Sequence, residues 1–105
     1  MSAAEKPDSA ASAQVLRALD MLELLCGALP AGLRNKDLSE ALQCPPSYVN
    51  RTADSLIAKG WAEKTEDGYL RATVRFGQLS FRVMASFAAA EQKLADLRRN
   101  YTQTN

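Results

Sequence analysis

The sequence predicts a mainly α-helical fold with one small β-hairpin and a long C-terminal helix. Apolar residues recur every three to four positions in four separate stretches, and this spacing places them on one face of a helix. Between the third and fourth stretches, Asp67 and Gly68 separate two short runs of alternating apolar and polar residues, which is a strong hairpin signal. The chain has 105 residues, the length of a single small domain.

The first helix is expected to begin near Ser12. Residues 1–12 are small and polar without apolar periodicity, so we expect a flexible tail there, a folded domain at 13–73, and a C-terminal helix with its tail at 74–105. Gly27 and Pro30 frame the end of the first helix. Apolar residues at spacings of four and three form a stripe that we expect to face the core: Val15, Leu19, Leu22, Cys26 and Leu29, widened by Leu16 and Leu25.

Two further helices are expected after a short connection at 31–34, which can supply a brief strand. Asn35 or Lys36 opens the second helix, and Asn35 is the better capping residue. The third helix, about 46–59, begins with a proline, which is favoured in a first helical turn, and stops before a glycine. Its helical projection turns five residues toward the core: Val49, Thr52, Ala53, Leu56 and Ile57.

The opposite face of this third helix is centred on Arg51. A guanidinium group binds guanine or phosphate well, and polar groups near a helix start exchange hydrogen bonds with bases or phosphates. A solvated helix face has the same residue types, so both interpretations stay open at this point. The face carries Ser47, Arg51, Asp54, Ser55 and Ala58, with Tyr48 and Asn50 on its two flanks.

The hairpin at 61–72 is followed by a last helix that we expect from Val74 to Tyr101, capped by Thr73. At 1.5 Å per residue this helix is roughly 42 Å long, more than a domain of this size covers with its own core. Part of it is therefore expected to pair with a second copy of the chain, and folding back on the first helix is the alternative. The predicted dimerisation residues form a near-heptad seam: Leu79, Val83, Phe87, Leu94, Leu97 and Tyr101.

Three helices followed by a hairpin, with a short turn between the second and third helices, is the order of a winged helix-turn-helix. Its third helix enters the major groove, so double-stranded DNA is the predicted partner. The net charge is only +1, and Glu66 and Asp67 at the hairpin tip repel phosphate, so one copy is expected to bind modestly. The predicted DNA-binding residues are Arg34, Lys36, Ser47, Tyr48, Asn50, Arg51, Ser55, Lys64 and Arg71.

Composition argues against several other classes of protein. The chain has no His, no glycine-rich phosphate loop and no ligand-spaced cysteines, so we expect no enzyme activity, no metal site and no cofactor. Cys26 and Cys44 lack a CxxC partner and follow no signal-peptide core, so we expect buried thiols in a cytoplasmic protein. No apolar run approaches the roughly 20 residues that cross a bilayer, so no membrane partner is expected.

A family resemblance is carried by three segments of the chain. They are VLRALDMLELL from Val15, GLRNKDLSEALQCPPSYVNRTADSLIAKGWAEK from Gly32 and EDGYLRATVRFGQLS from Glu66. Between Ala13 and Ser80 the chain resembles the DNA-binding domain of IclR-type transcriptional regulators. The resemblance implies a winged helix-turn-helix fold and DNA-contact roles for Ser47 and Arg51. Eight residues fall into the family pattern: Leu38, Ala41, Leu42, Pro45, Ser47, Arg51, Leu56 and Gly60.

The chain departs from that pattern in three respects. Gln43 replaces a turn glycine, so we expect either a different backbone in this turn or a strained conformation of Gln43. Asn35 and Lys36 replace the usual Leu-Ser, which puts a basic side chain where phosphate can lie. The sequence ends soon after the hairpin region, so no effector-binding domain and no small-molecule effector are inferred.

The interpretation that best joins these observations is a small, dimeric, sequence-selective transcription regulator. The alternative is a protein-interaction module on a winged-helix scaffold that binds a host regulator or a polymerase component. The near-zero net charge and the acidic hairpin tip motivate this alternative.

Overall fold

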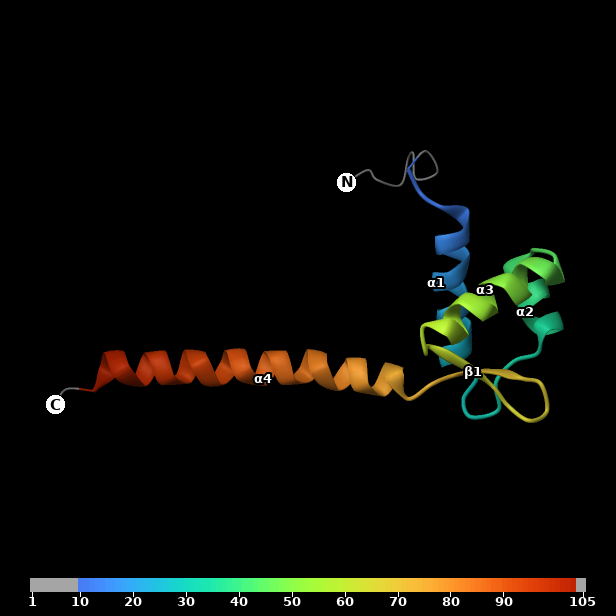
Figure 1. Ribbon diagram of the computed structural model, residues 1–105. Helices are drawn as coiled ribbons and strands as arrows, with labels where there is room; N and C mark the ends of the chain where they lie inside the picture. The colour runs from blue at the N-terminus through green and yellow to red at the C-terminus, as the bar shows by residue number, and fades with distance from the viewer. Residues whose placement is uncertain (1–9, 104–105) are drawn as a thin grey trace. The chain divides into compact units, whose positions relative to one another are not determined.

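The computed structural model describes residues 10–103, which fall into two compact units divided between Thr73 and Val74. The first unit contains α1 (Ala13–Cys26), α2 (Asn35–Leu42), α3 (Pro46–Ala58) and the strands β1 (Ala62–Lys64) and β2 (Leu70–Ala72); the second contains α4 (Arg75–Thr102) (Figure 1). This is the predicted winged helix-turn-helix with a long C-terminal helix. Most of the predicted flexible tail, residues 1–9, lies outside the described residues.

The start of α1 is fixed by a side-chain cap, as the sequence predicts. The Ser12 hydroxyl accepts a hydrogen bond from the backbone N–H of Val15 at 3.3 Å, which satisfies one of the donors that a helix leaves unpaired at its first turn. At the other end, Gly27 follows the last helical residue.

The buried face of α1 differs from the predicted stripe. Met21 and Leu25 are fully buried, whereas Val15 and Leu19 of the predicted stripe are 55% and 53% exposed. Leu25 belongs to the widened stripe and does face the core, whereas Met21 lies outside the stripe, so the buried face is displaced from the centre of the prediction. The expectation of two buried thiols is also wrong for Cys26, which is exposed.

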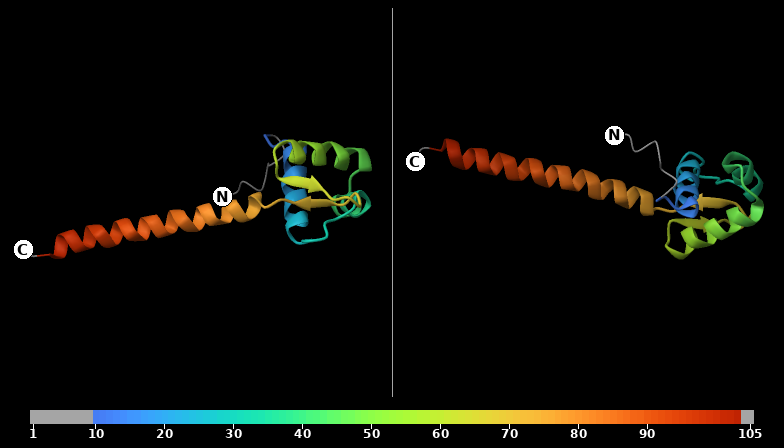
Figure 2. Two further views of the ribbon diagram at one scale, coloured as in Figure 1. Left: turned by 60° about the horizontal axis from the view of Figure 1, so that its bottom comes forward. Right: turned by 90° about the horizontal axis from the view of Figure 1, so that it is seen from above.

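The core of the first unit lies where α1 contacts α2, α3 and β2 (Figure 2). The inward face predicted for α3 is correct except for Ile57, which is 36% exposed at the end of the helix. The buried residues are Met21, Leu25, Leu38, Val49, Thr52, Ala53, Leu56, Ala62, Leu70 and Ala72.

The turn between α2 and α3 bends through Gln43, whose backbone is left-handed at φ 55° and ψ 48°. This is the strain expected from the missing glycine. The predicted cap of α2 is wrong, because the N-cap position belongs to Arg34, whose backbone N–H donates to the Asp37 carboxylate at 3.1 Å. The Asn35 side chain is directed to α3 instead.

The two strands pair antiparallel, with Glu63 opposite Arg71. The predicted brief strand before α2 forms one bridge, in which the backbone groups of Leu33 and Leu70 exchange hydrogen bonds of 2.9 and 2.8 Å. The hairpin is thereby joined to the connection between α1 and α2.

Thr73 closes the hairpin and does not cap the last helix. Its hydroxyl donates to the Gly60 carbonyl at 2.7 Å and its backbone N–H donates to the Trp61 carbonyl at 3.1 Å. Val74 is the N-cap of α4. The predicted cap is wrong because the Thr73 hydroxyl donates its hydrogen bond to Gly60, which is distant in sequence.

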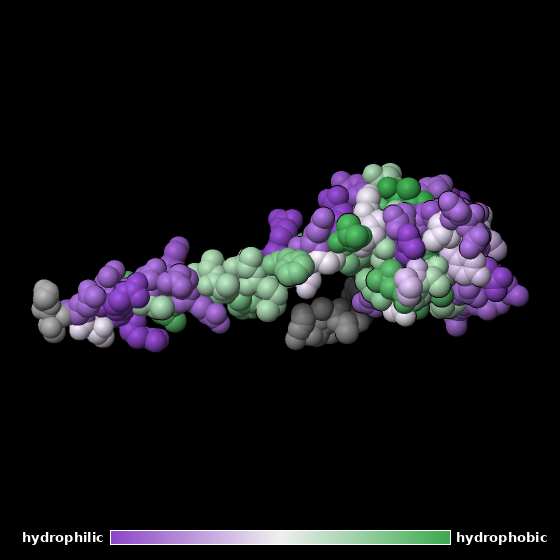
Figure 3. Space-filling model, turned by 90° about the horizontal axis from the view of Figure 1, so that it is seen from below, coloured by the Kyte–Doolittle hydropathy of each residue, from purple (hydrophilic) through white to green (hydrophobic). Residues whose placement is uncertain are grey.

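Taken by itself, α4 is a continuous helix of 28 residues, shifted by one residue at each end from the predicted range. None of these 28 residues is buried. Hydrophobic side chains gather over the middle of the helix and hydrophilic ones toward its C-terminal end (Figure 3). Near that end, the Asp96 carboxylate pairs with Arg99 and accepts a hydrogen bond from Gln92 at 2.9 Å.

Gly32 and Gly68 have similar backbone conformations but different surroundings, so substitutions at these two positions distinguish steric crowding from conformational strain. Gly32 has φ +90° and Gly68 has φ +87°, but a Cβ at Gly32 lies 2.5 Å from the Leu70 carbonyl oxygen, whereas a Cβ at Gly68 meets nothing within 4 Å. We expect Gly32→Ala to lower the free energy of unfolding by about 1–3 kcal/mol more than Gly68→Ala, since both share the strain and only the first must push β2 away. Urea denaturation measures both, and equal losses contradict the packing described here.

Candidate nucleic-acid interface

The outward face of α3 is formed as the sequence predicts. Ser47, Arg51 and Ser55 are exposed along one side of the helix, opposite the side that packs into the core. The Ser55 hydroxyl donates to the Arg51 carbonyl at 3.3 Å, one helical turn earlier. The predicted contact residues of α3 are therefore held in fixed register by the burial of the opposite face.

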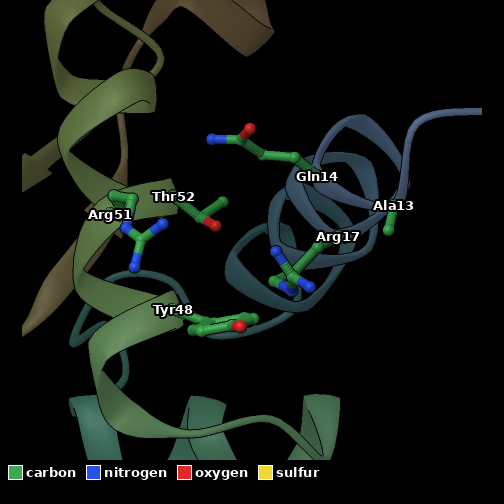
Figure 4. Close-up of a pocket in the computed structure, with 6 residues that line it drawn as sticks. All are labelled: Ala13, Gln14, Arg17, Tyr48, Arg51 and Thr52. Carbon is green, nitrogen blue, oxygen red and sulfur yellow. The ribbon is translucent and has the colours of Figure 1, made fainter.

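Tyr48 forms the edge of this face that is nearest to α1. The guanidinium carbon of Arg51 lies 5.2 Å from the centroid of the Tyr48 ring, and that of Arg17 lies 4.8 Å from it. Both are cation–π distances. Figure 4 shows the two guanidinium groups, from α3 and α1, converging on one side of the ring.

These residues border a pocket of about 200 Å³ between α1 and α3, called the α1–α3 pocket below. Sequence reasoning missed the contribution of Arg17, because nothing local links a residue of α1 to one in α3. The sequence feature that could have identified Arg17 is its charge within the apolar segment from Val15 to Leu19. The pocket is lined by Ala13, Gln14, Arg17, Tyr48, Arg51 and Thr52.

Asn50, another predicted contact residue, is engaged inside the protein. Its side-chain oxygen accepts a hydrogen bond of 2.7 Å from the Asn35 amide, which also donates to the Pro46 carbonyl at 3.3 Å. The side chain of Asn35 thus ties the start of α2 to the first turns of α3. Asn50 contributes to the angle between the two helices as well as to the outer surface.

The predicted contacts at the start of α2 differ in freedom. Arg34 lies 3.9 Å from the Asp37 carboxylate and 5.7 Å from the centroid of the Tyr69 ring, so its guanidinium is held between α2 and the hairpin. Lys36 is exposed, and the described residues offer it no ion pair. Of the two, Lys36 is the cation left available to an external anion.

The same contrast holds in the hairpin. Arg71 is paired with Glu63 across the two strands at 2.8 Å, and it also donates to the Pro30 carbonyl at 3.3 Å. Lys64 is exposed without an ion pair among residues 10–103, and the acidic tip residues Glu66 and Asp67 are exposed as well. The hairpin therefore presents one uncommitted cation beside an acidic tip.

The predicted dimerisation residues all belong to α4 and are exposed within it. Leu79 is 42% exposed and Tyr101 is 84% exposed at the two ends of the seam. A run of exposed apolar side chains on a single helix is typical of a surface that meets another protein. The seam comprises Leu79, Val83, Phe87, Leu94, Leu97 and Tyr101.

Residues 10–103 contain no group of three or more His, Cys, Asp or Glu side chains that can hold a metal ion. Of the helices in the same range, none combines the length and the apolar character that crossing a membrane requires.

Comparison with known protein families finds a match to the IclR helix-turn-helix domain over residues 14–66, just over half of the chain. The matched range contains α2, α3, β1 and all of α1 except its first residue, and it ends in the turn of the hairpin. It does not include α4. No curated protein and no solved structure matches the chain.

The hydrogen bond between Asn35 and Asn50 is expected to stabilise the helix pair measurably. In a double-mutant cycle with Asn35→Ala and Asn50→Ala, we expect a coupling free energy of about 0.5–1.5 kcal/mol, because each single variant removes the same bond. Urea denaturation of the four proteins measures it. Asn50→Ala combined with Asn100→Ala in α4 is the control, with additive effects expected; additivity in the Asn35 cycle contradicts a role for this bond.

Proposed function

The chain belongs to the IclR helix-turn-helix domain family, a family of DNA-binding transcription regulators, and from this premise we propose that it binds double-stranded DNA as a sequence-selective homodimer. In this proposal α3 lies in the major groove and the hairpin lies on the phosphate backbone. The observation that carries the proposal is the outward face of α3, where Ser47, Arg51 and Ser55 are exposed in fixed register.

In this proposal each predicted DNA-binding residue has a role that depends on whether its side chain already has a partner within the protein. Lys36 and Lys64 neutralise phosphates, because both are exposed and unpaired among the described residues. Ser47 and Ser55 offer hydroxyl groups to base edges. Arg34, Asn50 and Arg71 mainly position α2, α3 and the hairpin through the contacts described above, and their partial exposure adds polar surface to the interface.

Dimerisation is proposed to occur through the seam of α4. Pairing two seams buries apolar side chains that are otherwise in water, at roughly 25 cal/mol per Å². A two-fold dimer presents two copies of α3 to successive major grooves, about 34 Å apart, and the bound DNA is then an inverted repeat. Two linked weak sites bind far more tightly than one, which compensates for a net charge of only +1.

One observation favours a second candidate function. The exposed acidic pair Glu66 and Asp67 lies at the hairpin tip, where it repels a phosphate backbone. The same acidic pair can form ion pairs with basic side chains on the surface of another protein. The second candidate function is therefore a module that binds a protein partner. Two results together favour this second function over DNA binding. The chain binds no DNA at low salt, and a pull-down recovers a protein partner in stoichiometric amount.

The proposed phosphate contact of Lys64 is tested by its effect on salt dependence. We expect Lys64→Ala to weaken binding to a 24-base-pair duplex and to reduce the slope of log Kobs against log salt by about 0.9, the value for one lost phosphate contact. Fluorescence anisotropy at several salt concentrations measures this slope. Lys93→Ala, which removes the same charge from α4, is the matched control and is expected to leave the slope unchanged. Equal slopes for both variants argue against a hairpin contact.

The dimer seam is tested with two phenylalanines of the same helix. Phe87 belongs to the seam, whereas Phe81 lies on the other side of α4 at 100° per residue, and the two are 64% and 77% exposed. We expect Phe87→Glu to shift the chain to monomer, because a buried charge in the seam lacks a partner, and Phe81→Glu to leave the dimer intact. Sedimentation equilibrium measures the mass. A monomeric unmodified chain, or dissociation by both variants alike, contradicts the seam.

A further inference from the structure

The α1–α3 pocket brings two positive charges together. The guanidinium groups of Arg17 and Arg51 both lie over the ring of Tyr48, at 4.8 and 5.2 Å from its centroid (Figure 4). Like charges repel, and one aromatic ring offsets that repulsion only in part. An anion between the two cations can offset the remaining repulsion and accept hydrogen bonds from both guanidinium groups.

The protein itself supplies no such anion within the described residues. No Asp or Glu lines the pocket, and neither Arg17 nor Arg51 forms an ion pair with any of residues 10–103. By contrast, Arg34, Arg71 and Arg99 each have a carboxylate partner. The two arginines of the pocket therefore have charge left for an external ligand.

A buried hydroxyl group points to the same ligand independently. Thr52 is 1% exposed, and its side-chain oxygen has no hydrogen-bond partner among residues 10–103. It lines the pocket, and Figure 4 shows its hydroxyl oxygen directed to the space between the two guanidinium groups. A buried hydroxyl normally has a partner, and here it can donate a hydrogen bond to an oxygen atom of a bound anion.

We propose that the α1–α3 pocket binds one phosphate group of the DNA backbone, held by Arg17, Arg51 and the hydroxyl of Thr52. This inference rests on the proposed DNA-binding function and assigns a part of the contact to α1. The pocket volume of about 200 Å³ is several times the roughly 30 Å³ occupied by one water molecule, so it admits a group the size of phosphate. Planar guanidinium groups suit the geometry of phosphate oxygens.

The assignment changes the role of Arg51. A guanidinium held over Tyr48 beside a second arginine is directed to the backbone, so Arg51 fixes the position of α3 along the duplex and does not read guanine. Sequence is then read by neighbouring side chains on the outward face of α3. Phosphate is common to every sequence, so loss of either arginine weakens binding to all duplexes alike.

The test measures binding of the full chain to two unrelated 24-base-pair duplexes by fluorescence anisotropy, over a range of salt concentrations. We expect Arg17→Ala to lower affinity by the same factor on both duplexes and to reduce the slope of log Kobs against log salt by about 0.9. Arg98→Ala in α4 removes the same charge and is expected to leave both quantities unchanged. Thr52→Val is expected to weaken binding without loss of thermal stability, since valine keeps the shape and removes an unpaired group.

The possible outcomes separate this inference from the function on which it rests. If the unmodified chain binds neither duplex at low salt, both fall. If it binds, and Arg17→Ala behaves as Arg98→Ala does, the inference falls and the proposed function stands. A loss of affinity confined to one duplex also overturns the inference, because such a loss means that Arg17 contacts a base. If inorganic phosphate binds the unmodified chain at micromolar concentration while DNA affinity is independent of Arg17, the pocket serves a free anion and the inference is wrong.

Discussion

Burial of one face of α3 is the constraint on which the rest of the first unit depends. Val49, Thr52, Ala53 and Leu56 are buried on the side of α3 that packs against α1, α2 and β1, and this fixes the rotation of α3 about its own axis. Arg51 must then face outward. Because packed interiors tolerate little movement, the outward side chains are presented in one register rather than several.

The sequence predicted the elements well because each has a local signal. Ser12 caps α1, proline opens α3, and Asp67 with Gly68 forms the turn of the hairpin. The face that a helix buries has no local signal when the helix is apolar on two sides. For this reason Leu25, at the margin of the predicted stripe, and Met21, outside it, form the core, whereas Val15 and Leu19 near its centre are exposed.

The candidate site was less predictable, because intramolecular partners decide which polar side chains are available. Arg71 has the charge expected of a phosphate contact, but the register of the hairpin places it opposite Glu63. Asn50 lies on the predicted flank and is tied to Asn35. Arg17 reaches Tyr48 across a contact between α1 and α3 that no spacing rule describes. Such pairings depend on the tertiary structure and not on residue type.

In the proposed complex the first unit contacts DNA and α4 joins two copies of the chain on one duplex. Selection of bound sequences from a random DNA pool by the purified full chain tests this arrangement most directly. We expect enrichment of an inverted repeat whose half-sites are centred about 34 Å apart, one helical turn of DNA. Enrichment of a single asymmetric half-site, or no enrichment at all, contradicts it.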